Sequence, residues 1–124
     1  MTIKKMNSIY RDQILDHAKY PRNSGSLSDP DIEINESNQS CGDKIKLQVK
    51  FKDQQVGDVK FHCQGCALST AASSLLTEAV KGKSKTEIAQ MNLDDLYKLL
   101  GGPVNAGRAK CASLALKALQ KAVK

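Results

Sequence analysis

The chain has no tryptophan and few aromatic residues, which make up 4% of its 124 positions. Aliphatic side chains must therefore fill the core, and a chain of this length can bury one without disulfides or a structural metal. The hydrophobic fraction of 40% is well above that of a disordered chain. Because no repeat, low-complexity tract or linker interrupts the sequence, we expect one domain over residues 1–124.

Long apolar runs are missing as well. None approaches the roughly 18 residues that a membrane-spanning helix needs, and the N-terminal stretch 1–6 lacks the apolar segment of a signal peptide. We therefore expect a cytoplasmic protein with no membrane association. Thiols stay reduced in that compartment, so the four cysteines favour a metal site or thiol chemistry over disulfides.

The net charge is +6, but the basic residues are not concentrated in one segment. They are mostly lysines, with acidic residues among them and few aromatics beside them, which is not the pattern of a nucleic-acid binder. We expect no nucleic-acid partner. A basic surface that docks an acidic protein explains the same charge.

Alternating apolar and polar residues predict three strands in the first half of the chain. The clearest alternation covers residues 44–52, and a second one covers 59–63 after a turn that begins at Asp53. These two strands form a predicted hairpin, and Ile32 with Ile34 indicates a short third strand.

A helical period replaces the strand period after Gly65. Glycine, proline and capping-box signals bound the predicted helices. They comprise a first helix from Asn7 or Ser8 to Pro21, residues 66–81, short helices at Ser84–Glu87 and from Asn92 to Gly101, and one last helix from between Ala106 and Cys111 to the end. Strands followed by helices favour an α+β fold, with a three-stranded antiparallel sheet packed against helices on one face.

Three cysteines lie at the ends of predicted elements. Cys41 and Asp43 flank Gly42 between two strands, so the thiol and the carboxylate can face one point. Cys66 opens a helix, where the helix dipole stabilises a thiolate. Cys111 is also expected near a helix start. Three thiolates and a carboxylate fit a tetrahedral zinc site, and thiolates are the usual ligands of iron–sulfur clusters.

The neighbouring residues have simpler interpretations. Arg108 and Lys110 place positive charge beside Cys111, and Lys110 is either solvated or part of the site. Cys63 has the strand parity of a core residue, which weakens it as a partner of Cys66 in the Cys-x-x-Cys spacing. We expect His17 at the surface or in packing and His62 in solvent.

These motifs together resemble the U-type iron–sulfur cluster scaffold family, which comprises IscU, SufU and the N-terminal domain of NifU. The resemblance spans nearly the whole chain. It is carried by residues 10–17, Pro21-Arg22-Asn23, Cys41-Gly42-Asp43, Gly65-Cys66-Ala67-Leu68-Ser69, residues 73–78, Lys81-Gly82-Lys83 and residues 110–115. Each motif alone is weak, and their combination is specific.

The resemblance implies a sheet of three antiparallel strands with packed helices. It implies that Cys41, Cys66 and Cys111 accept persulfide sulfur and bind iron, and that Asp43 holds or releases the metal. The implied partners are a cysteine desulfurase and a cluster carrier or apo-protein recipient. A transient [2Fe–2S] cluster, iron and zinc are the implied cofactors, on a protein that is a monomer or a weak dimer when free.

Two departures from IscU concern the C-terminal part of the chain. Lys110 stands where IscU-type members have a histidine, and residues 102–106 replace the Leu-Pro-Pro-Val-Lys segment that a dedicated Hsp70-type chaperone recognises. We therefore expect no such chaperone. Arg108 and Lys110 are similar to SufU, yet the insertion that SufU members usually carry before the third cysteine is absent.

Four functions stay open on these grounds. The first is an assembly scaffold for a [2Fe–2S] cluster, not itself an enzyme. The second is a zinc-dependent sulfurtransferase that accepts persulfide, in which Arg108 pairs with Asp43 when the carboxylate leaves the metal. A thiol–disulfide protein using Cys63 and Cys66 ignores Cys41 and Cys111. A structural zinc domain is disfavoured because the chain has core enough to fold without metal.

Overall fold

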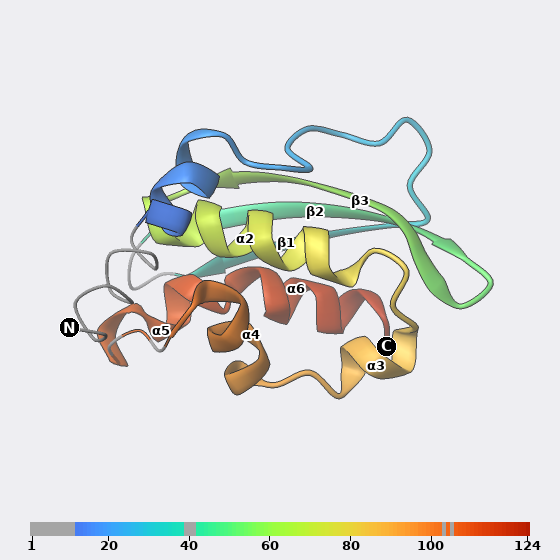
Figure 1. Ribbon diagram of the computed structural model, residues 1–124. Coiled ribbons are helices and arrows are strands. Elements are labelled where there is room, and N and C mark those ends of the chain that lie inside the picture. Colours follow the sequence, from blue (N-terminus) through green and yellow to red (C-terminus); the bar gives the residue numbers. More distant parts are fainter. Residues whose placement is uncertain (1–11, 39–41, 103, 105) are drawn as a thin grey trace.

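A computed structural model describes residues 12–38, 42–102, 104 and 106–124. Strands β1 (Ile32–Asn38), β2 (Asp43–Lys52) and β3 (Gln55–Gln64) form one antiparallel sheet in the order β1-β2-β3. Helices α2 (Ala67–Val80) and α6 (Leu114–Ala122) lie side by side against one face of the sheet (Figure 1). This arrangement is the expected α+β sandwich.

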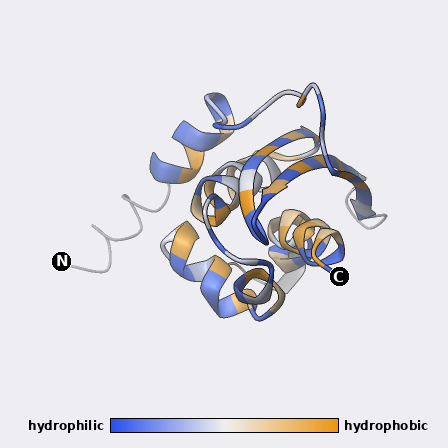
Figure 2. Cartoon of the chain, turned by 90° about the vertical axis from the view of Figure 1, so that its right-hand side faces the viewer, coloured by the Kyte–Doolittle hydropathy of each residue, from blue (hydrophilic) through white to orange (hydrophobic). Residues whose placement is uncertain are grey.

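Strand β2 shows why the sheet has one buried face. Ile45, Leu47 and Val49 are at most 2% exposed, whereas Lys44 and Lys46, which alternate with them, are exposed on the opposite face. Figure 2 shows the same alternation along the strands, and the apolar sides of the helices turned toward the sheet. The period of two residues places every second side chain on the core, as predicted.

The predicted β2–β3 hairpin is confirmed, with Leu47 opposite Phe61 and Val49 opposite Val59. Its two connecting residues, Asp53 and Gln54, have positive φ values of 55° and 68°. Positive φ at both loop positions is the geometry of the two-residue turn that matches the twist of antiparallel strands. The turn sets the pairs beside it, and an irregularity between Lys50 and Phe51 shifts the register before the core pairs.

Strand β1 is longer than its two isoleucines indicated, because the inner face continues through Glu36. The Glu36 side chain is 9% exposed and pairs with two lysines of α6, at 2.7 Å from Lys121 and 3.8 Å from Lys117. These ion pairs allow a carboxylate at a position where alternation expects an apolar residue. They also join the edge strand to α6.

The helices α3 (Lys85–Ala89) and α4 (Leu93–Leu100) begin where the capping boxes predicted. In each, the side chain at the N-cap, Ser84 or Asn92, accepts from the backbone of the third helical residue, and the reciprocal bond is also present. Helix α4 ends at Gly101 with a φ of 94°, a left-handed conformation that favours glycine.

The prediction of one continuous C-terminal helix was wrong. The segment forms α5 (Ala106–Ala112) and α6, separated at Ser113, whose ψ of 1° departs from helical geometry. Helical periodicity continues on both sides of the single-residue break, so the sequence pattern could not distinguish two short helices from one long helix. Cys111 consequently lies in the last turn of α5, not near a helix start.

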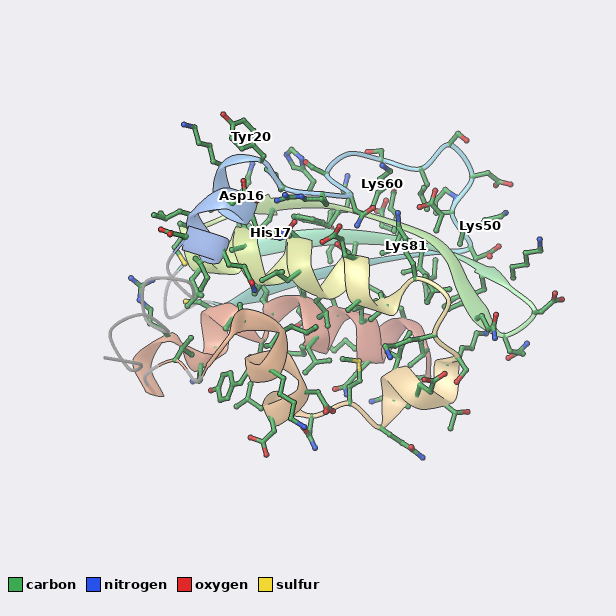
Figure 3. The ribbon with its side chains drawn as sticks, viewed as in Figure 1. Asp16, His17, Tyr20, Lys50, Lys60 and Lys81 are labelled. Atoms are coloured by element: carbon green, nitrogen blue, oxygen red, sulfur yellow. The ribbon has the colours of Figure 1, made fainter. Side chains whose placement is uncertain are left out.

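The N-terminal helix, residues 12–19, packs on α2 through His17 (Figure 3). His17 is 8% exposed, and its Nδ1 lies 2.7 Å from Ser74 Oγ. The same hydroxyl accepts the Arg22 backbone N–H at 2.8 Å. His17 is therefore a packing residue, one of the two roles expected for it. Burial, followed by the nearby Arg22 cation, lowers the pKa of His17 below its usual 6.5.

This lowered pKa predicts that acid destabilises the protein through His17. The folded state binds the proton less readily than the unfolded chain. Stability is therefore lost as the pH falls through the unfolded value near 6.5 and continues to fall until the lower folded pKa is reached. The variant His17→Asn, which cannot take up a proton, should lose less unfolding free energy between pH 7.5 and 5.5 in urea titrations. The exposed His62→Asn is the matched control, and an equal loss in His17→Asn and the wild type would refute the prediction.

Candidate metal centre

Asp43, Cys66 and Cys111 come together at one end of the sandwich. One ligand atom from each, a carboxylate oxygen or a sulfur, lies within 4.8 Å of the others. Asp43 is the first residue of β2, Cys66 is the N-cap of α2, and Cys111 lies in the last turn of α5. Residues distant in the sequence thus meet where β2 begins, α2 begins and α5 ends (Figure 1).

The Asp43 carboxylate is buried because it shares the strand parity of Ile45 and Leu47. It is only 2% exposed. Gly42, with a φ of +73°, brings the chain into β2, and its N–H donates to the Asn38 carbonyl at 2.8 Å. The expectation that glycine gives this connection a tight backbone is confirmed for Gly42.

Cys66 contacts the carboxylate with both its backbone and its side chain. Its N–H donates to Asp43 Oδ1 at 3.2 Å, and its thiol donates to Oδ2 at 3.5 Å. The Cys66 backbone is extended (φ −73°, ψ 167°) and its side chain does not cap α2. The sulfur therefore remains directed to the site, at the positive end of the helix dipole.

Gly65 leaves no space for any side chain beside the carboxylate. A Cβ built on Gly65 would lie 2.5 Å from Asp43 Cγ and Oδ1, far inside van der Waals contact. The glycine before Cys66 is thus required by close approach and not by an unusual φ. The Gly65-Cys66 motif was visible in the sequence, but the sequence did not reveal that the Asp43 carboxylate lies against this glycine.

Sequence reasoning gave no role to Ser69, a 1% exposed residue in the first turn of α2. Its hydroxyl donates to Asp43 Oδ2. It also lies 3.5 Å from Cys66 Sγ and 3.2 Å from the Cys111 carbonyl oxygen. The available signals were its place in the Gly65-Cys66-Ala67-Leu68-Ser69 motif and its spacing of three residues from Cys66, which places both on one helix face.

Cys63 is outside this group of converging ligand atoms. It lies half-buried against the hydrophobic core, in agreement with its strand parity. Burial raises the pKa of the Cys63 thiol, with smaller contributions from neighbouring groups. A thiol with a raised pKa is a weaker nucleophile and a weaker metal ligand at neutral pH.

The remaining candidate residues are exposed, lie in packing or are outside the described residues. Cys41 lies outside the described residues, two positions before Asp43. Arg108 and Lys110 are exposed on α5, His62 is exposed on the outer face of the sheet, and His17 packs against Ser74. The expected stabilisation of Cys111 by a helix start was wrong, because the residue is at the opposite end of α5.

The donor set present fits zinc. Tetrahedral zinc takes sulfur at about 2.3 Å and carboxylate oxygen at about 2.0–2.2 Å, so its ligand atoms stand roughly 3.5–3.8 Å apart. A group within 4.8 Å needs only a small contraction to reach this geometry. Thiolates also hold iron in iron–sulfur clusters. A structural site would need a fourth ligand, which the described residues do not provide within this distance.

Comparison with known proteins shows the family of this chain. The model of the NifU-like N terminal domain matches residues 9–124. The chain belongs to this NifU-like family. No helix in the described part of the chain is long and apolar enough to cross a membrane.

Named relatives in the NifU-like family include two bacterial proteins of similar length. The zinc-dependent sulfurtransferase SufU of Bacillus subtilis (strain 168) is 36% identical over 135 residues, covering 95% of this chain and 91% of SufU. The iron–sulfur cluster assembly scaffold protein IscU of Streptococcus pyogenes serotype M1 is 36% identical over 142 residues, covering 100% and 88%.

Solved structures agree with the NifU-like fold. A crystal structure of a hypothetical protein has a TM-score of 0.81 at 34% identity, covering 94% of this chain and 98% of that one. A putative assembly scaffold of the SUF system from Fervidobacterium islandicum AW-1 has a TM-score of 0.77 at 28% identity, with the same coverage. These likenesses confirm the α+β fold class.

Because Gly65 lies so close to the Asp43 carboxylate, we predict that a methyl group introduced at position 65 is incompatible with the site. The variant Gly65→Ala should displace the Asp43 carboxylate and weaken zinc binding by about 10–100-fold, the usual effect of disturbing the surroundings of a ligand. Competition against a chromophoric chelator measures this. Gly57→Ala, where the nearest atoms to a new Cβ are 3.4 Å away, is the matched control on β3. Wild-type zinc affinity in Gly65→Ala would contradict the prediction.

Proposed function

We propose that this protein is an assembly scaffold for iron–sulfur clusters, built as a single domain over residues 1–124. Cys41, Cys66 and Cys111 accept sulfur and bind iron, and Asp43 is the fourth ligand of a transient [2Fe–2S] cluster. A cysteine desulfurase supplies the sulfur as persulfide, and an external two-electron reductant converts each persulfide sulfur to the sulfide of the cluster. The finished cluster passes to a carrier or an apo-protein recipient.

The observation that carries this proposal is the meeting of Asp43, Cys66 and Cys111 within 4.8 Å. In the family of this chain, relatives that are 36% identical and are covered over 88% and 74% of their length are named cluster assembly scaffolds. We include Cys41 among the ligands because of its position in Cys41-Gly42-Asp43. The carboxylate of Asp43, two residues further along the chain, faces the site.

The position of the site suits a cargo that must be built and released. Cys66 is partly exposed, whereas Asp43 and Cys111 are 2% and 3% exposed. A partner can therefore reach one thiol while the other two donors stay shielded. A persulfide formed on Cys66 would lie beside the carboxylate and next to the sulfur of Cys111.

A second candidate function is zinc-dependent sulfur transfer. Its specific support is the 36% identity with the Bacillus subtilis SufU sulfurtransferase, together with a donor set that fits zinc. Zinc would be held by the same four residues, and one cysteine would leave the metal to take persulfide. Arg108, which is exposed on α5, would pair with Asp43 when the carboxylate is released.

We further propose that the protein works without a dedicated Hsp70-type chaperone and as a monomer or a weak dimer. The chaperone proposal rests on the sequence of residues 102–106, which lacks the recognised Leu-Pro-Pro-Val-Lys segment. Pull-down with the cognate Hsp70-type chaperone and light scattering of the free protein are the corresponding measurements.

The scaffold proposal predicts which cysteines the cluster needs. Anaerobic reconstitution with desulfurase, iron, cysteine and a thiol reductant should give visible cluster absorbance with matching iron and acid-labile sulfide. Cys41→Ala, Cys66→Ala and Cys111→Ala should each remove most of it, because each loses a ligand. Cys63→Ala is the matched control and should retain it. Undiminished absorbance in the three ligand variants would refute the proposal.

The two candidate functions predict different behaviour of the zinc form. If sulfur transfer is the function, zinc-loaded protein should stimulate sulfide release by the desulfurase without forming a cluster, and Asp43→Ala should lower that stimulation. If the scaffold is the function, iron should replace zinc during reconstitution and sulfide should accumulate on the protein. Desulfurase turnover and protein-bound sulfide, measured on the same samples, separate these outcomes.

A further inference from the structure

Ser69 contacts three elements of the site at once. It lies in the first turn of α2 and is 1% exposed. Its Oγ donates to Asp43 Oδ2 at the start of β2, lies 3.5 Å from Cys66 Sγ at the N-cap of α2, and lies 3.2 Å from the Cys111 carbonyl oxygen in α5. A buried hydroxyl therefore stands at the centre of the group that converges on the metal.

The Ser69 hydroxyl has one proton and two oxygen acceptors. A serine hydroxyl donates a single hydrogen bond. An ionised carboxylate and a backbone carbonyl can only accept, so Asp43 and Cys111 compete for the same proton. A backbone carbonyl oxygen has two lone pairs and can accept more than one hydrogen bond. The carbonyl is thus a suitable second acceptor.

We propose that Ser69 is a positioning residue that holds the Asp43 carboxylate in place for the metal and turns its proton to the Cys111 carbonyl when the carboxylate leaves. In its bound position the carboxylate accepts hydrogen bonds from the Ser69 hydroxyl and from the Cys66 N–H. On release, the buried hydroxyl keeps a hydrogen bond, which avoids the cost of an unpaired buried donor. This inference rests on the proposed ligand role of Asp43.

The physical basis is the control of a ligand by its outer hydrogen-bond partner. Carboxylates that bind metals are themselves hydrogen-bonded, and removing such a partner typically costs about 10–100-fold in affinity. The Ser69 contact lies on Oδ2, the oxygen that also accepts the Cys66 thiol. When metal replaces that thiol proton, Ser69 still fixes the plane of the carboxylate.

The test is zinc affinity, measured on the full chain by chelator competition. Ser69→Ala should weaken zinc binding by about 10–100-fold. Ser73→Ala is the matched control, since Ser73 is equally buried one turn further along α2 and donates to the Ser69 carbonyl at 2.8 Å. Its zinc affinity should stay close to that of the wild type. Equal affinities of Ser69→Ala and the wild type would overturn the inference.

A double-mutant cycle with Asp43→Ala separates positioning from a general structural effect. Because Ser69 acts through Asp43, adding Ser69→Ala to Asp43→Ala should cause no further loss of zinc affinity. Additive losses would overturn the inference. Wild-type affinity in Asp43→Ala alone would instead overturn the ligand role of Asp43, and with it this inference.

Unfolding in urea and a conservative variant complete the design. Ser69→Thr keeps the hydroxyl and should retain more zinc affinity than Ser69→Ala. The free energy of unfolding of each metal-free variant shows whether the fold is intact. A Ser69→Thr protein of wild-type stability that binds zinc as weakly as Ser69→Ala would contradict the role of the hydroxyl.

Discussion

The buried Asp43 carboxylate is the contact on which the arrangement of the site depends. It accepts hydrogen bonds from the Cys66 backbone and from Ser69, so it joins the start of β2 to the start of α2. The register of the sheet brings the carboxylate to this position. Lys44 of β2 pairs with Gln64 of β3, so Asp43 and Gly65, the residues just beyond this pair, lie beside each other. A slip of one residue would turn every inner side chain of β2, Asp43 included, to solvent.

This contact has an electrostatic cost that the surroundings offset. A carboxylate that is 2% exposed is unfavourable unless it is hydrogen-bonded or paired. The N-terminus of α2 supplies backbone N–H and a favourable dipole, and Ser69 supplies a hydroxyl. The same groups hold the carboxylate close to the two sulfurs, within 4.8 Å.

The same donors serve both candidate functions, because thiolate and carboxylate ligands suit zinc as well as the iron of a cluster. The family does not separate them either, since similar relatives carry either name. The difference lies in how readily the carboxylate and one thiol leave the metal. Cys66 and Ser69 donate hydrogen bonds to the carboxylate and Gly65 lies close beside it, and Arg108 and Lys110 lie on the helix that carries Cys111.

The sequence by itself determined the elements whose signals are local. Alternation fixed the inner face of β2 and β3, two capping boxes fixed the starts of α3 and α4, and motif resemblance indicated Asp43, Cys66 and Cys111 as one group. Tertiary structure alone decided that Ser113 divides the last helix, that Cys111 lies at the end of α5, and that Ser69 touches all three elements. The physical reason is that hydrogen bonds and packing between distant segments leave no periodic trace in the chain. Neither the break nor the buried hydroxyl could be read before β2, α2 and α5 were placed together.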